Sequence, residues 1–135
     1  MLLKNKHIFI VEDDPTNRAV ISTILKRNGA MVSFDHWGDT TISKMRETSD
    51  IDLILLDLML PRQVSGYDVF DAFRKIPELQ KIPVVAVTAS DPDGEMNKAR
   101  QKGLNGYISK PINRRRFPQQ VKAVLDGEEV WGDDF

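Results

Sequence analysis

Apolar residues gather in five short runs along the chain, each bounded by glycine, proline, asparagine or charged residues. Runs of this length that are rich in Ile, Leu and Val are typical of strands buried on both faces of a parallel sheet. The run at residues 53–57 ends in a carboxylate, Asp57. We therefore predict five strands, at residues 7–11, 31–34, 53–57, 83–88 and 105–110.

Between these runs, apolar residues recur at helical spacing. The first helical segment stops before Gly29, and its apolar stripe comprises Val20, Ile21, Ile24 and Leu25. Asn113 is suited to cap the last helix, and Pro118 is expected to delay or distort its start. Residues 61–66 are predicted to form a loop. The other helices are predicted at residues 38–48, from 67 to before Pro77, at 91–102, and from 113 to about 126.

Strands and helices alternate five times, which indicates an α/β fold with a parallel sheet covered by helices on both faces. The expected architecture is a doubly wound, flavodoxin-like sheet of five strands in the order 2-1-3-4-5, with five helices. Residues 1–127 would form this single domain. Residues 128–135 make an acidic C-terminal tail, which either frays or docks through Val130 and Trp131 on the body or on a second subunit.

Composition excludes several classes of function. The chain has 135 residues, a formal net charge of −1 and no cysteine, so general nucleic-acid affinity, disulfides and thiol chemistry are not expected. No apolar segment is long enough to cross a membrane, and a cytoplasmic protein is the expectation. His7 and His36 lack the spacing of metal ligands. The run Arg114-Arg115-Arg116 is more typical of a solvated helix face than of a nucleic-acid site.

Polar residues follow the predicted strands at one edge of the sheet. Glu12 and Asp13 follow the first strand, and Asp57 ends the third. Thr88 ends the fourth strand and Lys110 ends the fifth. Ligands of such sheets bind at the carboxyl ends of the strands, where the strand order reverses, which here lies between the first and third strands. We expect these five side chains to meet there.

Packing three carboxylates together requires compensating charge. At about 4 Å and an effective dielectric constant of about 20, each like-charged pair costs roughly 4 kcal/mol. Lys110 alone cannot neutralise three acids, so we predict a divalent cation, and Mg²⁺ suits carboxylate ligands beside phosphate. A carboxylate such as Asp57 can attack phosphorus to form an aspartyl phosphate. Lys110, Thr88 and the metal would then stabilise the phosphoryl oxygens.

Four segments together resemble the receiver domain of bacterial two-component response regulators, of the stand-alone, chemotaxis-regulator-like kind. The resemblance covers nearly the whole chain. Each segment alone is weak evidence, but their order and their places at the strand ends are specific. The segments are residues 10–15 (Ile-Val-Glu-Asp-Asp-Pro), 56–61 (Leu-Asp-Leu-Met-Leu-Pro), 87–89 (Val-Thr-Ala) and 109–111 (Ser-Lys-Pro).

The resemblance implies roles for individual residues. Asp57 would accept a phosphoryl group from a sensor histidine kinase or phosphotransfer protein. Glu12, Asp13, Asp57 and the backbone carbonyl of Met59 would bind Mg²⁺. Thr88 and Lys110 would sense the phosphoryl group, and Tyr107 would turn inward on activation.

The resemblance also implies how the signal leaves the domain. The fourth helix, fifth strand and fifth helix would carry it to a downstream target protein or a phosphorelay. Such a domain is not a conventional enzyme, although it can catalyse its own phosphorylation and dephosphorylation. Such a domain is expected to act as a monomer or a homodimer.

Two departures from the family pattern and three alternatives accompany this interpretation. The first acid is Glu12, where Asp is also common, and the loop between Pro61 and Gly66 is one residue longer than usual. One alternative is a receiver-like binding module that works without phosphorylation. The others are a Mg²⁺-dependent phosphohydrolase of the haloacid dehalogenase type, which carries its nucleophile after the first strand, and an FMN binder, whose phosphate Glu12 and Asp13 would repel.

Overall fold

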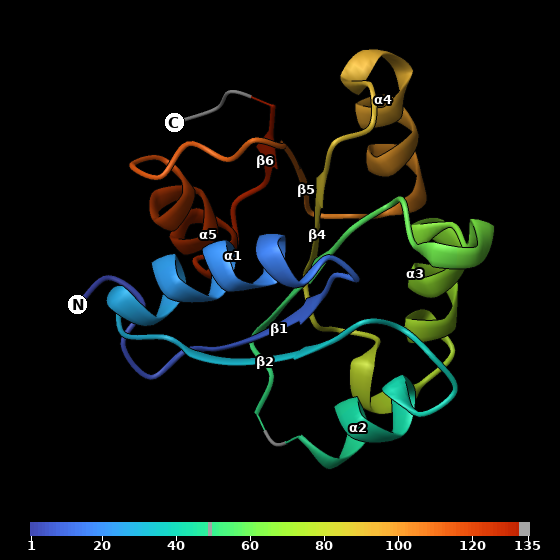
Figure 1. The fold of residues 1–135 in the computed structure, drawn as a ribbon, viewed down its shortest axis with the longest axis horizontal. Helices are drawn as coiled ribbons and strands as arrows, with labels where there is room; N and C mark the ends of the chain where they lie inside the picture. The colour runs from blue at the N-terminus through green and yellow to red at the C-terminus, as the bar shows by residue number, and fades with distance from the viewer. Residues whose placement is uncertain (49, 133–135) are drawn as a thin grey trace.

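The computed structural model describes residues 1–48 and 50–132, and these form one parallel sheet with helices on both faces (Figure 1). The predicted order 2-1-3-4-5 is confirmed, with one strand added beyond it, so that the order of the described strands is β2-β1-β3-β4-β5-β6. The strands are β1 (His7–Val11), β2 (Met31–Asp35), β3 (Leu53–Leu56), β4 (Val84–Thr88), β5 (Gly106–Ser109) and β6 (Val130–Trp131).

The prediction of five strands was therefore wrong by one. Val130 and Trp131 pair in parallel with β5, so this part of the acidic tail docks on the body of the domain. A strand of two residues has no detectable alternation, and the acids at positions 128 and 129 hid it in the sequence. Residues 133–135 of the predicted tail lie outside the described residues.

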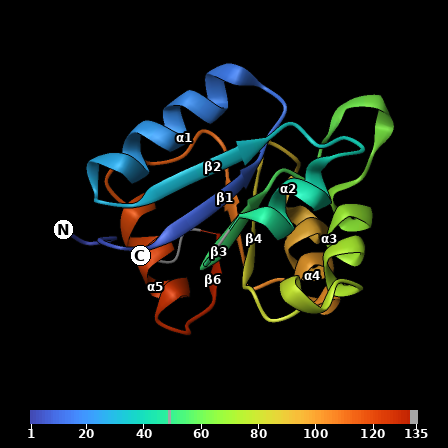
Figure 2. The ribbon, with the colours of Figure 1, turned by 90° about the horizontal axis from the view of Figure 1, so that it is seen from below.

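Helices cover the two faces of the sheet unequally (Figure 2). Helices α1 and α5 lie on one face, and α2, α3 and α4 lie on the other. Two short 3₁₀ turns, η1 (Pro61–Gln63) and η2 (Pro77–Leu79), flank α3. The helices are α1 (Pro15–Arg27), α2 (Thr41–Glu47), α3 (Gly66–Arg74), α4 (Pro92–Lys102) and α5 (Phe117–Leu125).

The central strands supply side chains to both cores. Ile8 and Ile10 of β1 pack in the core under α1 and α5, whereas Phe9 and Val11 pack in the core under α2, α3 and α4. Strands β3 and β4 are likewise buried along their whole length. A strand with a core on each face needs apolar residues at every position, which explains why these segments are continuous apolar runs.

The start of α5 differs from the prediction. Asn113 does accept hydrogen bonds, from the backbone N–H groups of Arg115 and Arg116 at 3.0 and 3.1 Å, but it closes a separate turn. The helix itself begins at Phe117. Pro118 in its first turn has no N–H to offer to the preceding residues, and this delays the helix as expected.

Within the described part of the chain, no helix combines the length and the apolar character needed to cross a membrane.

Phe117 is a test of the α1–α5 core. Its ring is fully buried (0% exposed), so Phe117→Ala should lower the free energy of unfolding by about 3–5 kcal/mol through lost contacts and a residual cavity. Urea denaturation would measure this. The matched control is Phe34→Ala, which removes a ring that is 45% exposed and contacts two cations, and it should cost only about 1 kcal/mol. Equal losses for the two variants would contradict the described core.

Candidate functional site

The carboxyl ends of β1, β3 and β5 bring charged residues together at the switch point of the sheet. Strands β1 and β3 are neighbours, and Val11 lies opposite Leu56 at their ends. The backbone N–H of Asp57 donates to the carbonyl of Val11 at 3.1 Å, which fixes Asp57 beside the acidic loop after β1. This is the edge of the sheet that the sequence predicted.

Lys110 joins two of the acids. Its Nζ donates to Oδ2 of Asp57 at 3.0 Å and also to Oε1 of Glu12. The side chains are only 12%, 9% and 4% exposed for Lys110, Asp57 and Glu12, respectively. Buried charges persist only when they are paired, so the ion pairs permit these side chains to leave water.

The environment shifts the pKa of both partners of this pair. Burial raises the pKa of Glu12 above its ordinary 4.5, the hydrogen bond from Lys110 opposes that rise, and the charge of Asp57 adds to it. Burial alone would lower the pKa of Lys110, but the hydrogen bond to Glu12 and the charge of Asp57 outweigh it and raise that pKa. Lys110 is therefore protonated at neutral pH.

The other oxygen of Asp57 is held by the loop that follows it. Oδ1 accepts from the backbone N–H of Met59 at 3.0 Å. Gly66 at the start of α3 lies against the same turn, because a Cβ at this position would come within 2.6 Å of the carbonyl oxygen of Asp57. Gly66 thus lets the helix approach the site, a role that the sequence analysis did not assign.

Arg18 holds the acidic loop from the side of α1. Its guanidinium donates to the backbone carbonyls of Glu12 and Asp13 at 3.0 and 3.1 Å. It also lies 4.9 Å from the centre of the Phe34 ring, which favours a cation–π contact. The sequence analysis missed Arg18, because an arginine in a helix gives no sign of which carbonyls it reaches.

A cleft of about 440 Å³ opens above the ion pairs. Asp13 is exposed in it, whereas the neighbouring Asp14 caps α1 by accepting from the backbone N–H of Thr16 at 2.8 Å. Four of the five residues predicted to meet therefore line one cleft. Its lining comprises Glu12, Asp13, Asp14, Asn17, Asp57, Met59, Leu60, Pro61, Ala89 and Lys110.

Thr88 is the exception among the five predicted residues. It is fully buried beside the cleft, and its neighbour Ala89 provides the lining there. Its backbone carbonyl accepts from the N–H of Lys110 at 2.9 Å, and its Oγ1 accepts from the N–H of Ser90 at 3.3 Å. Ser90 in turn bonds Tyr107: the two hydroxyl oxygens lie 2.8 Å apart, and the Tyr107 hydroxyl donates to the Ser90 carbonyl at 3.0 Å.

Tyr107 points into the protein and is fully buried. Burial raises the pKa of its hydroxyl, and the bond with Ser90 partly opposes this rise. Hydrogen bonds therefore run from Lys110 through Thr88 and Ser90 to Tyr107 on β5. They link the backbone of Lys110 at the site to a buried tyrosine on the strand that pairs with β6.

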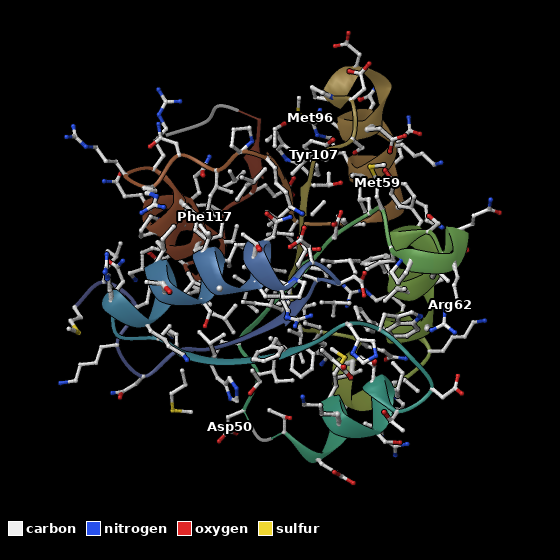
Figure 3. The ribbon with its side chains drawn as sticks, in the orientation of Figure 1. Asp50, Met59, Arg62, Met96, Tyr107 and Phe117 are labelled. Carbon is white, nitrogen blue, oxygen red and sulfur yellow. The ribbon has the colours of Figure 1, made fainter. Side chains whose placement is uncertain are left out.

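The longer loop after Pro61 folds back on itself. Arg62 and Gln63 both adopt left-handed backbone conformations, with φ of 58° and 60°. Beyond them the chain returns, and Met59 and Ser65 form an antiparallel bridge. Met59 lies at the rim of the site with 62% of its surface exposed, and Arg62 lies farther out (Figure 3).

The donor set partly fits a hard divalent cation. Asp13, Asp57 and the carbonyl of Met59 offer the oxygen ligands that Mg²⁺ prefers, all around the same cleft. Within residues 1–48 and 50–132, however, no three carboxylate or imidazole groups are gathered closely enough to hold a metal as they stand. Lys110 lies between Glu12 and Asp57 instead, so a cation would have to displace it from at least one of them.

The two histidines and the arginine run considered in the sequence analysis lie outside the cleft. His7 Nε2 lies 2.8 Å from the Ser33 hydroxyl between two strands, and His36 lies beside Asp35. The side chains of Arg114, Arg115 and Arg116 are exposed, in agreement with a solvated face.

Comparison of the sequence with known proteins gives consistent results. A sequence model of the family described as the response regulator receiver domain matches residues 8–122. The chain is 37% identical over 120 residues to the polar-differentiation response regulator DivK of Brucella ovis, and the alignment covers 89% of this chain and 96% of that protein. DivK of Brucella anthropi matches to the same extent. The chain thus spans nearly the whole length of these relatives.

Solved structures agree. The receiver domain of the sensor histidine kinase PA1611 from Pseudomonas aeruginosa PAO1, described with a magnesium ion coordinated in the active site cleft, superposes with a TM-score of 0.76 at 28% identity. The match covers 91% of this chain and 98% of that one. The chemotaxis response regulator CheY4 of Vibrio cholerae superposes with a TM-score of 0.78 at 20% identity over 88% and 98% of the two chains, which supports the fold alone.

The ion pairs of Lys110 predict a pH-dependent loss of stability. Lys110→Met leaves Glu12 and Asp57 without their cation, so the pKa of Glu12 in the folded chain rises further above the 4.5 of the unfolded chain. An acid with a raised pKa binds more protons when folded. The loss of unfolding free energy caused by Lys110→Met is therefore absent below pH 4.5 and grows as the pH rises toward the new pKa of Glu12. Above that pKa the loss is complete and should reach about 2 kcal/mol or more.

Urea unfolding of both chains in metal-free buffer, at acid and at neutral pH, measures this difference. The control is the double variant Glu12→Gln/Lys110→Met, which removes the unpaired carboxylate and should recover a large part of the loss. A loss for Lys110→Met that is the same at both pH values would show that packing, and not charge, explains it.

Proposed function

The chain belongs to the response regulator receiver domain family, and from this we propose that Asp57 accepts a phosphoryl group in a Mg²⁺-dependent transfer. The domain then passes this signal to a partner protein. The observation that carries the proposal is the environment of Asp57. Its carboxylate lies at the floor of a cleft, with one oxygen on the Lys110 ammonium and the other on a backbone N–H. Both contacts orient a nucleophile that the sheet edge presents to a donor.

The transfer itself follows simple chemistry. A carboxylate oxygen of Asp57 attacks the phosphorus atom of a phosphohistidine or a small acyl phosphate, a new O–P bond forms, and the bond between phosphorus and the donor breaks. Such reactions depend mainly on positioning and on charge stabilisation. Lys110 is placed to move from the Asp57 carboxylate to the phosphoryl oxygens, because its ammonium already contacts the attacking group.

Mg²⁺ would be held by Asp13, Asp57 and the carbonyl of Met59, with Glu12 contributing after it leaves Lys110. When bound, the ion neutralises carboxylate charge and polarises the phosphoryl group. The magnesium ion described in the cleft of the PA1611 receiver domain supports this assignment. The net negative charge of the site gives the independent physical reason, since one ammonium cannot balance three carboxylates.

Thr88 and Tyr107 would convert the new charge into a change of surface. A phosphoryl group adds about −1.5 to −2 charge at neutral pH. Turning the Thr88 hydroxyl toward it would withdraw the acceptor of the Ser90 N–H, and Ser90 is the residue that holds the Tyr107 hydroxyl. The faces of α4, β5 and α5 next to Tyr107 are thus the natural output surface.

The partners follow from this chemistry. A sensor histidine kinase or phosphotransfer protein would supply the phosphoryl group in the cytoplasm, and a downstream protein would read the α4–β5–α5 face. The domain acts as a signalling protein that catalyses its own phosphorylation, and not as an enzyme that turns over a metabolite. Monomer and homodimer are both compatible with an acceptor site formed by a single chain.

The acceptor assignment is tested with acetyl phosphate and Mg²⁺. The wild-type chain should gain one acid-stable, base-labile phosphoryl group, seen by intact-mass measurement, and EDTA should prevent the gain. Asp57→Asn removes the nucleophile and should abolish labelling. The matched control is Asp71→Asn, an exposed acid on α3 paired with Lys102, which should label like the wild type. Labelling of Asp57→Asn at the wild-type level would refute the assignment.

Thr88→Val tests the transmission step. The substitution keeps the shape of the side chain and removes the hydroxyl, so Asp57 should still be labelled. Phosphorylation should then affect Ser90 and Tyr107 less. The difference between their amide signals in NMR spectra recorded with and without phosphodonor should be at least about twofold smaller than in the wild type. Thr23→Val, on the exposed side of α1, is the control. Equal shifts in all three chains would remove Thr88 from the pathway.

A further inference from the structure

Arg18 and Phe34 meet beside the acidic loop, residues 12–14, without lining the cleft themselves. Arg18 belongs to the first turn of α1, and Phe34 lies near the carboxyl end of the edge strand β2. The start of α1 lies over that end of β2 (Figure 2). The two residues therefore contact the loop from the side that faces away from Asp57.

One nitrogen atom of Arg18 holds two consecutive carbonyls. Its Nη1 donates to the carbonyl of Glu12 at 3.0 Å and to the carbonyl of Asp13 at 3.1 Å. These carbonyls belong to the peptide groups on the two sides of the Asp13 Cα. Because a peptide group is planar, fixing both groups fixes the two backbone dihedral angles of Asp13. The direction in which the Asp13 side chain leaves the backbone is thus set by Arg18.

Asp13 is the acid of this loop for which direction matters most. Glu12 is paired with Lys110, and Asp14 caps α1 by accepting from the N–H of Thr16 at 2.8 Å. The side chain of Asp13 is exposed in the cleft and forms no ion pair within residues 1–48 and 50–132. It is therefore the carboxylate of the loop that can meet a cation without first giving up another contact.

Phe34 keeps the guanidinium of Arg18 in place. The guanidinium lies 4.9 Å from the centre of the Phe34 ring. On the other side, Lys44 of α2 lies 5.5 Å from the same ring centre, and its Nζ donates to the Phe34 carbonyl at 2.6 Å. A cation over an aromatic face gains about 0.5–1 kcal/mol at an exposed site. The ring thus favours one placement of a long side chain, in which its N–H groups meet carbonyls.

We propose that Arg18, supported by Phe34, is a positioning residue that sets the affinity of the cleft for a divalent cation through the direction of Asp13. The inference rests on the proposed function, in which Asp13 is a ligand of Mg²⁺. Groups that orient metal ligands without touching the metal change metal affinity by about tenfold or more when they are removed. Coulomb attraction alone predicts the opposite sign, because removing a positive charge near the acids favours cation binding.

The test is a Mg²⁺ titration of the isotope-labelled full chain, followed through the amide signals of Asp13, Asp57 and Met59 in NMR spectra. Arg18→Met keeps the aliphatic part of the side chain and removes both hydrogen bonds to the loop. It should weaken Mg²⁺ binding by about tenfold. Phe34→Leu leaves Arg18 in the chain without its aromatic support and should weaken binding by roughly two- to fivefold.

The matched control is Lys26→Met, which removes the same charge from an exposed position in the last turn of α1. It should bind Mg²⁺ like the wild type, because Lys26 contacts neither the loop nor Phe34. Together, the three variants separate the loss of a charge from the loss of the contacts that orient Asp13.

A second measurement separates positioning from a general loss of structure. The rate of labelling with acetyl phosphate is recorded as a function of Mg²⁺ concentration. Arg18→Met should raise the Mg²⁺ concentration that gives half-maximal labelling and change the rate at saturating Mg²⁺ much less. A chain that is merely less folded would instead lose rate at every Mg²⁺ concentration.

Three outcomes would overturn the inference. Arg18→Met could bind Mg²⁺ as tightly as the wild type or more tightly, which is the result that charge alone predicts. Lys26→Met could lose as much affinity as Arg18→Met. The loss of labelling rate could fall entirely on the value at saturating Mg²⁺. Failure of the proposed function is recognised separately, since the wild-type chain itself would then show no response to Mg²⁺.

Discussion

The structure depends on compensating the charge that gathers where parallel strands end. In a parallel sheet the carboxyl ends of all strands share one edge, so acids that follow β1 and β3 must meet at the switch point. Glu12 and Asp57 are nearly buried there, and neither could be so without the Lys110 ammonium. Lys110 arrives from β5, two strands beyond β3, which means that the sheet must be complete before the charges balance.

This constraint explains what sequence alone could and could not predict. Strands β1, β3 and β4 lie between two cores, so they are continuous apolar runs and are readily recognised. The convergence of Glu12, Asp13, Asp57 and Lys110 follows from strand order and needs no side-chain detail. Strand β6 escaped prediction because its pairing is decided by β5, through Gly106, and not by its own two residues.

The supporting contacts of the site were hidden for a similar reason. Gly66 looks like an ordinary helix start, and only the approach of α3 to the Asp57 carbonyl shows why a side chain is excluded. Arg18 looks like a solvated helix residue until Phe34 and the carbonyls of the acidic loop are placed beside it. Both roles depend on tertiary contacts. The local sequence pattern cannot reveal them, because the residue that is contacted lies in another part of the chain.

Between the site and the far edge of β5, a path of hydrogen bonds runs through Thr88, Ser90 and Tyr107 to Gly132. Such a path transmits a signal only if some element along it has two arrangements. Helix α4 has the features of that element. Ala99 is its buried residue, and its first turn leaves helical geometry at Asp93 and Gly94. Met96 also packs against the core under α2, α3 and α4, and Glu95 accepts from the buried Tyr67 hydroxyl at 2.6 Å. Lys102 pairs with Asp71 at the surface, where such contacts exchange readily with water.

Helix α4 also carries Arg100, whose guanidinium lies 4.6 Å from the centre of the Trp131 ring on β6. The same helix therefore contacts Trp131 of β6, which pairs with Tyr107 on the path from the acceptor site. A movement of α4 that shifts Arg100 changes its contact with Trp131, and a change at β6 acts back on α4 through the same contact.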